Sequence, residues 1–586
     1  MSLTYQPEAM AANSDFKSLT VGSTRWIARC DWVEMLLDTA QQGGDGLRLE
    51  EWVAAGEARV VKQGAHRTVY RVDSAESAFY VKHYRCPSLS DLARNVLRPT
   101  ASRREFYKAL ELARRGVPTI EPIALGESRR AGLVGQNYLV TRAIPRTMSL
   151  LALASEFLPR LSIDRQQLLR ARLAEALASL CVQLHRAGVF HNDLHGGNIL
   201  VQLDSLEPDQ GGRIVPRLFL VDLPGVRFSA PLDWPASRDS LLMLHSDWSE
   251  RATVAERWRF WRHYWLERAE LRLADRRAAG MEIFGLTRDY GCRVLAGRVK
   301  RALRTNRDFH AHRNRVAFGH AVAGYSAADL ARLVDDPEQL MSQHWDEPVK
   351  LSRASTMVTA RVMLDGVSTP VAYKRLQPRH WWKRVADLAR RNRALSAWLV
   401  GHALLERGIA TARPIAVVVP RDWRRLGAGY LATEWIDDAL NLHLFLWQVA
   451  QLPLDERRTV TRQMAIALGK LIGRMHAWRV SHRDLKGCNL LLSRRGEQVI
   501  AYLIDLDGVK IRRRLGYREQ VRNLARLAAS AEAHALVQHS DRRSFLKAYA
   551  QELLPQVTDA KQLWRDVARE TRRVLARFKQ RGKPVA

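Results

Sequence analysis

The sequence of 586 residues predicts an α+β protein in which one two-lobed domain occurs twice in tandem. The first observation is an internal repeat, because segments of the first half return in the same order in the second half. In each copy, short β-type runs come first and stretches with helical periodicity follow, which predicts a small β-rich lobe and a larger helical lobe. Apolar residues make up 47% of the chain and charged residues 26%, a composition that excludes wholesale disorder.

The repeat consists of motifs that keep their order and nearly their spacing in both copies. Ordered matches of this kind are far beyond chance, so the chain is predicted to be a tandem of one domain type. The matching pairs are GVPTIEPIALGE (116–127) with GIATARPIA (408–416), FYVKHY (79–84) with VAYKRL (371–376), HNDLHGGNILV (191–201) with HRDLKGCNLLL (482–492), and FLVDLPGV (219–226) with YLIDLDGV (502–509).

The elements of each copy can be taken in order. The β-type runs are VVKQGAHRTVYRV and SAFYVKHY in the first copy, and VTARVML and TPVAYKRL in the second. A helix and a second strand pair, ending in YLVT or YLAT, are expected next. The helical lobe then begins with a stripe of apolar residues at helical spacing, which is typical of a core-facing helix. The stripes are Leu169, Leu173, Leu177, Leu180 and Leu184, and Met464, Leu468, Ile472 and Met475.

The limits of the domains follow from these patterns. Residues 1–45 are expected to be an N-terminal extension, in which WIARCDWVEMLL suggests an extra helix on the first small lobe. The first domain is placed at 46–305 and the second at 341–586. Residues 306–340 are expected to be a linker, because the polar and basic stretch TNRDFHAHRNRVAFGH follows the last helical pattern of the first copy.

Cysteine usage and hydropathy indicate a cytoplasmic protein. The five cysteines lie far apart without a CxxC pair, which argues against disulfide frameworks and structural zinc. The first residues lack the features of a secretion signal, and no uncharged apolar run reaches the roughly 18 residues of a membrane span. The net charge of +32 suits a polyanionic partner, although an overall arginine bias would produce the same number. No nucleic-acid motif is present, so specific binding of nucleic acid is not expected.

Each copy repeats the pattern Lys … His-x-Asp-Leu-x-x-x-x-Asn … Asp. A lysine on a strand can neutralise nucleotide phosphates, and the first aspartate can accept a proton from an attacking hydroxyl. The asparagine and the second aspartate offer the hard oxygen ligands that Mg²⁺ prefers. The pattern therefore predicts phosphoryl transfer by Lys82, Asp193, Asn198 and Asp222 in the first copy, and by Lys374, Asp484, Asn489 and Asp505 in the second.

These motifs resemble a known superfamily. HRDLKGCN and LIDLDG look like the catalytic and metal-binding loops of protein-kinase-like enzymes. HNDLHGGNILV, the GVPTIEPIALGE turn and a weak glycine loop resemble more specifically the lipopolysaccharide kinase family, which phosphorylates the Kdo or heptose sugars of the lipopolysaccharide inner core. The resemblance implies an ATP- and Mg²⁺-dependent kinase that acts on lipopolysaccharide. It also implies two tandem protein-kinase-like domains, each with a small N-lobe and a helical C-lobe.

The resemblance also assigns roles to residues. Lys82 would hold the nucleotide phosphates and pair with Glu105, and Gly64 would belong to the glycine loop. Asp193 and Asp484 would be the catalytic bases. The metal ligands would be Asn198, Asp222, Asn489 and Asp505, and Lys374 would repeat the role of Lys82.

Departures from the family pattern leave alternatives open. Neither copy has GxGxxG: KQGAHRTV keeps the single Gly64, and KLSRASTMVT has no glycine. The second copy has Ala397 where the first has Glu105, so the first copy is expected to be catalytic and the second either active or degenerate. A pseudokinase scaffold and a kinase for a soluble or protein acceptor are the alternative functions.

Two clusters rich in arginine and tryptophan bear on membrane association. RHWWKR (379–384), together with RNVLR (94–98), is expected near the cleft mouth, where it could rest on an anionic membrane surface and make the protein peripheral. For RWRFWRHYW (257–265), the favoured interpretation is a helix that buries its tryptophans.

Overall fold

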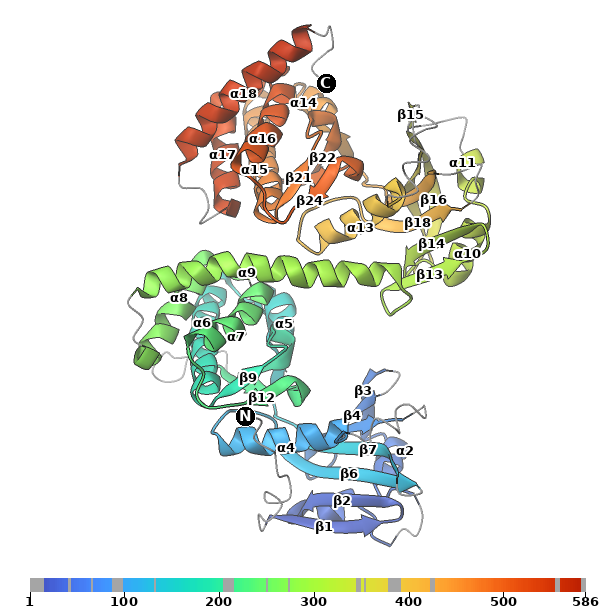
Figure 1. Ribbon diagram of the computed structural model, residues 1–586, viewed down its shortest axis with the longest axis vertical. Coiled ribbons are helices and arrows are strands. Elements are labelled where there is room, and N and C mark those ends of the chain that lie inside the picture. The colour runs from blue at the N-terminus through green and yellow to red at the C-terminus, as the bar shows by residue number, and fades with distance from the viewer. Residues whose placement is uncertain are drawn as a thin grey trace. The chain divides into compact units, whose positions relative to one another are not determined.

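The structure of the chain is a computed structural model. It describes residues 15–40, 44–64, 67–86, 98–130, 133–203, 215–248, 251–271, 275–343, 349–352, 355–377, 391–421, 427–553 and 559–580. The chain forms two compact units that meet in the sequence between Thr287 and Arg288 (Figure 1). Helices and sheets are mixed in both units, as the sequence predicts.

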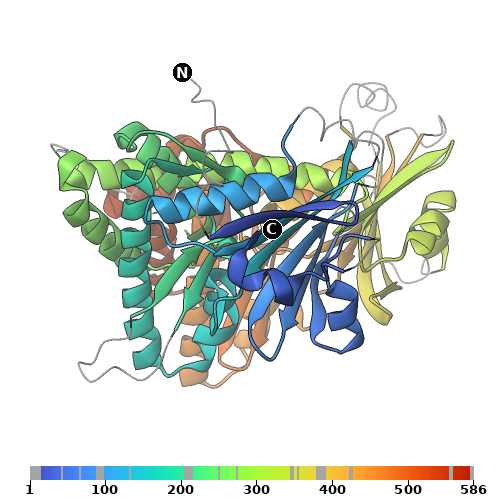
Figure 2. The same cartoon turned by 90° about the horizontal axis from the view of Figure 1, so that it is seen from below.

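The small lobe of the first unit is a seven-stranded antiparallel sheet in the order β1-β2-β6-β7-β5-β4-β3. Its strands are β1 (Phe16–Val21), β2 (Thr24–Arg29), β3 (Ala58–Gln63), β4 (Arg67–Asp73), β5 (Ala78–Tyr84), β6 (Pro122–Arg130) and β7 (Leu133–Arg142). Two short helices, α1 (Val33–Leu36) and α2 (Leu49–Ala54), follow β2 in the sequence. Helix α4 (Ala101–Arg114) lies against β6 and β7 (Figure 2), and the Thr100 side chain caps its first turn.

The second unit repeats this strand order as β13-β14-β18-β19-β17-β16-β15. Its strands are β13 (Phe309–Arg313), β14 (Ala317–Val322), β15 (Lys350–Ser352), β16 (Ser355–Leu364), β17 (Val367–Leu376), β18 (Pro414–Pro420) and β19 (Gly429–Glu434). Helix α13 (Arg393–Leu405) packs on β18 and β19, as α4 packs on the first sheet. Helices α10 (Ala327–Asp335) and α11 (Gln339–Ser342) lie between β14 and β15 in the sequence.

The helical lobes also correspond element by element. The first contains β8 (Thr147–Ser149), α5 (Leu150–Ala152), α6 (Ile163–Arg186), β9 (Val189–His191), β10 (Ile199–Gln202), β11 (Arg217–Leu220), β12 (Val226–Phe228), α7 (Trp234–Trp248), α8 (Val254–Glu267) and α9 (Arg276–Val299), which continues into the second unit. The second contains β20 (Ala439–Asn441), α14 (Leu442–Val449), α15 (Leu454–Ala477), β21 (Val480–His482), β22 (Leu490–Arg495), β23 (Gln498–Leu503), β24 (Val509–Ile511), α16 (Tyr517–Ala531), α17 (His539–Leu553) and α18 (Ala560–Gln580). Every residue of the two predicted apolar stripes on α6 and α15 is buried, which confirms them as core.

Two segments differ from the expected domain limits. Residues 16–29, expected in an extension, form the hairpin β1-β2, which pairs with β6. Residues 309–322, expected in a linker, form the corresponding hairpin β13-β14, which pairs with β18. Each hairpin is therefore part of its sheet. In WIARCDWVEMLL, residues 26–29 belong to strand β2, and only Val33–Leu36 form a short helix, α1.

A threonine ties the two lobes of each unit together. The Thr119 hydroxyl donates a hydrogen bond to the carbonyl oxygen of Leu220 at 2.8 Å, and the Leu220 N–H donates to the Pro118 carbonyl at 2.9 Å. In the second unit the Thr411 hydroxyl donates to the Leu503 carbonyl at 2.6 Å. Because Leu220 and Leu503 end β11 and β23, these bonds fix the turn after α4 or α13 to the strand that leads into the site.

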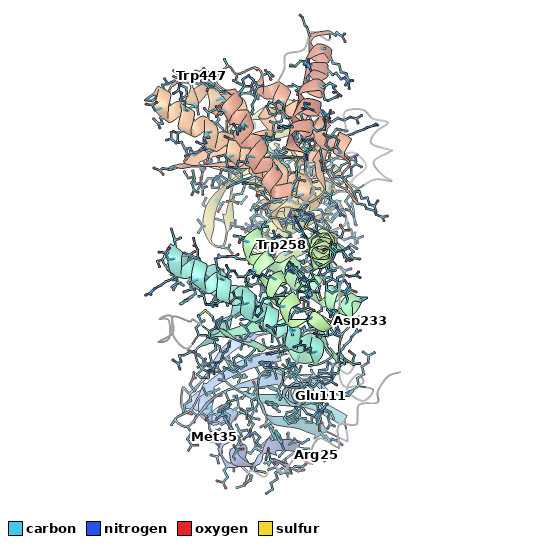
Figure 3. The ribbon with its side chains drawn as sticks, turned by 90° about the vertical axis from the view of Figure 1, so that its left-hand side faces the viewer. Arg25, Met35, Glu111, Asp233, Trp258 and Trp447 are labelled. Carbon is cyan, nitrogen blue, oxygen red and sulfur yellow. The ribbon has the colours of Figure 1, made fainter. Side chains whose placement is uncertain are left out.

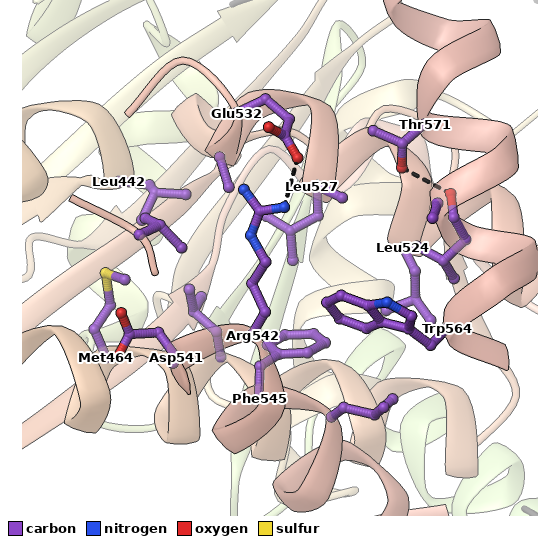
Figure 4. A pocket seen from close by; sticks show the side chains of 18 of the residues that line it. Leu442, Met464, Leu524, Leu527, Glu532, Asp541, Arg542, Phe545, Trp564 and Thr571 are labelled. Atoms are coloured by element: carbon purple, nitrogen blue, oxygen red, sulfur yellow. Dashed lines mark hydrogen bonds and ion pairs between the residues drawn. The ribbon is translucent and has the colours of Figure 1, made fainter. Parts of the chain in front are cut away.

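The cores of the two helical lobes are packed differently. Helices α7 and α16 correspond residue for residue, but Ala528 and Ala531 stand where the first unit has His245 and Trp248. An apolar cavity of about 360 Å³ in the second unit is lined by Ala528 and Ala531 and also by α18, whereas a cavity of about 70 Å³ in the first unit is lined by His245 and Trp248 and by no residue of α9. The cavity is lined by side chains from α14 to α18 (Figure 4), among them Met464, Leu468, Leu524, Phe545 and Trp564.

Two glycines with left-handed backbones differ in the space around them. Gly188, after α6, has φ +66°, and a Cβ there would overlap the carbonyl oxygen of Ser229. Gly116, after α4, has φ +70°, and nothing lies within 4 Å of a Cβ there. We expect Gly116→Ala to cost about 1 kcal/mol from backbone strain alone and Gly188→Ala about 3 kcal/mol. Urea denaturation of the two variants checks this, and equal losses of stability would contradict it.

Candidate active site

In the first unit a lysine and a glutamate meet between the sheet and α4. Lys82 projects from β5, and its Nζ forms an ion pair of 2.5 Å with Oε1 of Glu105 on α4. The Glu105 side chain is fully buried, and the Tyr84 hydroxyl donates a hydrogen bond to its other oxygen at 3.0 Å. A buried carboxylate is tolerated where both oxygens are paired in this way. The structure thus brings together Lys82 and Glu105, as the sequence predicts.

The loop between β9 and β10 carries Asp193 and Asn198. The Asn198 amide nitrogen donates to the Asp193 carbonyl at 2.9 Å, which fixes the loop and leaves the Asn198 amide oxygen to accept or coordinate. The Asp193 N–H donates to Nδ1 of His191, a buried histidine whose pKa is lowered by burial. The Asp193 carboxylate itself is 73% exposed, with Nε2 of His195 at 3.6 Å. It is therefore open to an incoming substrate.

Asp222 follows β11, and its Oδ1 lies 4.0 Å from the guanidinium of Arg67 on β4. Its backbone is left-handed, with φ 58° and ψ 62°, and its side chain is 46% exposed. The Val221 N–H donates to the Asn198 carbonyl at 2.9 Å, so this strand end is bonded to the loop that carries Asn198. The Lys108 ammonium on α4 donates to the Pro224 carbonyl at 2.7 Å, which ties α4 to the turn after Asp222.

The donor set of Asn198 and Asp222 fits Mg²⁺. It offers one amide oxygen and one carboxylate, and Mg²⁺ usually takes one or two carboxylates and completes its shell with water and substrate phosphates. Across the described parts of the chain, no group of three or more His, Cys, Asp and Glu side chains is arranged to hold a metal. An all-protein metal cage of that kind is therefore not seen there.

The second unit arranges the same motif differently. Nζ of Lys374 bonds Oδ1 of Asp505 at 2.8 Å, so the lysine pairs with the predicted metal ligand. The cause is visible on α13, where the buried methyl group of Ala397 stands in the place of Glu105. Asp505 has the same left-handed backbone as its counterpart, with φ 58°.

The second loop keeps its internal bonds. The Asn489 amide nitrogen donates to the Asp484 carbonyl at 2.8 Å, and the Asp484 N–H donates to Nδ1 of His482. Lys486 lies 3.6 Å from the Asp484 carboxylate, which is 59% exposed. The sequence motif therefore forms the same loop in both units, and the two sites differ in how the lysine is paired.

Gly64 lies in the turn between β3 and β4. Its N–H donates to the Arg67 carbonyl at 2.8 Å, which closes the turn. Arg85, three residues after Lys82, donates to the Gly64 carbonyl at 3.3 Å and to the Thr68 hydroxyl at 2.8 Å. The sequence analysis gives no role to Arg67, Tyr84 or Arg85, although Arg67 lies in KQGAHRTV and Tyr84 in FYVKHY.

The structure describes one of the two clusters rich in arginine and tryptophan, RWRFWRHYW on α8. In α8 the side chains of Phe260, Trp261, Tyr264 and Trp265 are buried, which confirms a core helix. Trp258, labelled in Figure 3, packs against Phe284 with ring centroids 5.3 Å apart. RHWWKR lies outside the described residues, as does RNVLR apart from its last residue. Where the helices are described, none has the length and apolar character needed to cross a membrane.

Comparison with known proteins places the chain among kinases. The model of the lipopolysaccharide kinase (Kdo/WaaP) family matches residues 50–264 and 373–549. The lipopolysaccharide core heptose(I) kinase WaaP of Pseudomonas aeruginosa is 27% identical over 237 residues, which are 39% of this chain and 85% of that protein. The 3-deoxy-D-manno-octulosonic acid kinase of Haemophilus influenzae (strain 86-028NP) is 32% identical over 132 residues, and the chain spans about half of its length (49%).

Solved structures give weaker likenesses. WaaP in complex with acyl carrier protein is 21% identical with a TM-score of 0.29, covering 40% of this chain and 91% of that one. The BubR1 kinase domain is 13% identical with a TM-score of 0.23, covering 39% of this chain and 64% of that one.

The relatives and the family model together show that this protein is a kinase. The family model matches more than half of the chain, in two segments that fall one in each half. The chain belongs to the lipopolysaccharide kinase (Kdo/WaaP) family.

Proposed function

We propose that this protein transfers the terminal phosphoryl group of ATP to a sugar hydroxyl, of Kdo or heptose, in the lipopolysaccharide inner core at the cytoplasmic face of the membrane. The observation that carries the proposal is the arrangement of the first unit. Lys82 is paired with Glu105, and the loop that carries Asp193 and Asn198 is bonded to the strand end before Asp222. Asp222 lies 4.0 Å from Arg67, on the strand next to that of Lys82. The printed names of the relatives, a heptose(I) kinase and a 3-deoxy-D-manno-octulosonic acid kinase, support the acceptor. The charge of +32 suits an acceptor that bears phosphates and carboxylates at an anionic surface.

Each unit would be one protein-kinase-like domain, with its sheet as the N-lobe and its helices as the C-lobe. In the first domain Lys82, held by Glu105, would neutralise the inner phosphates of ATP. Asp193 would orient the acceptor hydroxyl and accept its proton, for which its exposed carboxylate is suited. Asn198 and Asp222 would hold Mg²⁺, which supplies positive charge at the phosphates when bound.

The second unit has a different proposed role. Its Lys374 is bonded to Asp505, the residue that would have to bind metal, and Ala397 offers the lysine no alternative partner on α13. We therefore assign transfer to the first unit and a supporting, weakly active or inactive role to the second.

The proposal is tested with the purified full chain, ATP, Mg²⁺ and lipopolysaccharide truncated after Kdo or after the first heptose. Mass spectrometry is expected to detect one added phosphate on one of the two acceptors, and a chelator should abolish the gain. Phosphate gain only on added soluble proteins would favour the alternative acceptor class. The absence of any transfer would overturn the proposal. Sedimentation with anionic vesicles at low and physiological salt tests the membrane location.

A further inference from the structure

Arg67 is a charged side chain near Asp222 to which the motif gives no role. It is the first residue of β4, and its guanidinium lies 4.0 Å from Oδ1 of Asp222, with 27% of its side chain exposed. The register of the sheet explains its position, because Arg67 pairs with Tyr84 across the β4-β5 ladder, two residues beyond the Lys82 pair. Arg67 therefore lies on the strand next to the lysine and reaches over to the predicted metal ligand.

Arg67 is joined to the lysine by a chain of contacts. Its guanidinium lies over the Tyr84 ring, 5.9 Å from the centroid. The Tyr84 hydroxyl bonds Glu105, and Glu105 pairs with Lys82. Burial alone would lower the pKa of the Arg67 guanidinium, but Tyr84 and Asp222 raise it, so the side chain stays cationic.

The backbone that carries Arg67 is held firmly. Its carbonyl accepts the Gly64 N–H, and Arg85 bonds both the Gly64 carbonyl and the Thr68 hydroxyl on either side of the turn. The described residues that flank the β3-β4 connection, Gly64 and Arg67 with Thr68, are thus held together by hydrogen bonds. Such bonds can keep the Arg67 side chain at a fixed place.

The Arg67 guanidinium lies close to the Asp222 carboxylate but is not hydrogen-bonded to it. Charge-assisted hydrogen bonds between nitrogen and oxygen are typically about 2.7–2.9 Å long, and the separation of 4.0 Å is well beyond that range. An arginine presents a planar fork of donors that matches a phosphate. In a site without the glycine-rich backbone that usually surrounds phosphates, such a fork can supply the missing donors.

The second unit has no arginine at the matching position of the described ladder. The register there pairs Ser355 with Leu376, two residues beyond the Lys374 pair, so these two residues replace Arg67 and Tyr84. The unit without the glutamate partner therefore also has a serine, not an arginine, at this register position. The glutamate that pairs with the lysine and the arginine near the second aspartate occur together in the first unit, to which we assign phosphoryl transfer.

We propose that Arg67 binds the terminal phosphates of the nucleotide in the first unit, in place of the backbone donors of a glycine-rich loop. The proposal rests on the proposed function, since it requires a nucleotide at this site. The proposal predicts that Arg67 contributes to the binding of ATP but not to the binding of AMP. A residue that only supports the fold would affect both.

The test measures binding of ATP and of AMP, each with Mg²⁺, by calorimetry on the full chain in a Lys374→Ala, Asp505→Ala background, which removes the lysine and the carboxylate proposed for the second unit. We expect Arg67→Met to weaken ATP binding about tenfold or more and to leave AMP binding unchanged. Arg67→Lys keeps the charge without the fork and is expected to lose part of the ATP affinity. Arg71→Met is the matched control, because Arg71 lies on the same strand but pairs with Asp73 at 2.9 Å.

Equal losses of ATP and AMP affinity in Arg67→Met would overturn the inference, and so would unchanged ATP affinity. Should the methionine variant fail to fold, judged by its thermal midpoint against Arg71→Met, an Arg67→Lys variant with full ATP affinity would overturn it as well. A Lys82→Ala variant separates the two proposals. If it loses ATP binding while Arg67→Met does not, only the role of Arg67 fails; if the parent chain binds no ATP, the proposed function fails too.

Discussion

Asp193→Asn is expected to lower the turnover of phosphoryl transfer by a factor of about 100 or more, because the acceptor hydroxyl loses the carboxylate that takes its proton. Asp484→Asn should leave most of the transfer intact, since the second unit pairs its lysine with Asp505. Both carboxylates are largely exposed, 73% and 59%, so neither exchange should disturb folding. Steady-state kinetics of the two full-length variants makes the comparison.

The affinity for ATP provides the control for this pair. It should change little in Asp193→Asn, because the loop is held by the backbone carbonyl of residue 193 rather than by its side chain. Equal loss of turnover in both variants would mean that both units transfer phosphate. A loss confined to Asp484→Asn would reverse the assignment.

Glu105→Ala is expected to weaken binding of ATP with Mg²⁺ and to lower kcat/KM about tenfold or more, because Lys82 loses its buried partner. The second unit shows the arrangement that we expect to result. There, with alanine at the corresponding position, the lysine turns to the aspartate that would otherwise bind metal. Lys82 of the variant should pair with Asp222 in the same way, which sets the ammonium group in competition with Mg²⁺.

The reciprocal exchange and a matched control make this prediction specific. Ala397→Glu should release Lys374 from Asp505 and strengthen Mg²⁺-dependent nucleotide binding by the second unit. Glu111→Ala is the control on the same helix, because Glu111 pairs with Arg114 and Arg115 outside the cleft. It should affect stability alone; if it reduced nucleotide affinity as much as Glu105→Ala, the special role of Glu105 would be disproved. Calorimetric titration with ATP at several Mg²⁺ concentrations measures all three variants.

Much of the site could be predicted from the sequence because its chemistry depends on short motifs. The loop that carries Asp193 and Asn198 closes through bonds between residues five apart, so its geometry follows from local sequence. The pairing of Lys82 with Glu105 was predictable for another reason, since a lysine on a strand and a glutamate on the following helix are expected to face each other in this superfamily.

Other features depended on contacts that the sequence alone does not reveal. The hairpins β1-β2 and β13-β14 have little sequence in common. They correspond because they pair with matching strands, β6 in the first unit and β18 in the second. The position of Arg67 depends on the register between β4 and β5, which no motif encodes. The cavity of the second unit is lined by side chains from five helices, α14 to α18, so it appears only when their packing is known.

The bonds between Thr119 and Leu220 and between Thr411 and Leu503 give each unit a natural pivot. If the two lobes swing apart to admit a large acceptor, the parts joined at this point travel least and the distant parts travel most. Glu105 on α4 and Asp222 beyond β11 both lie on elements that adjoin the tie, whereas β3 and β4 form the far edge of the sheet. Opening would then move Arg67 farther from Asp222 than it moves Glu105, so the proposed phosphate contact of Arg67 would be the first to loosen.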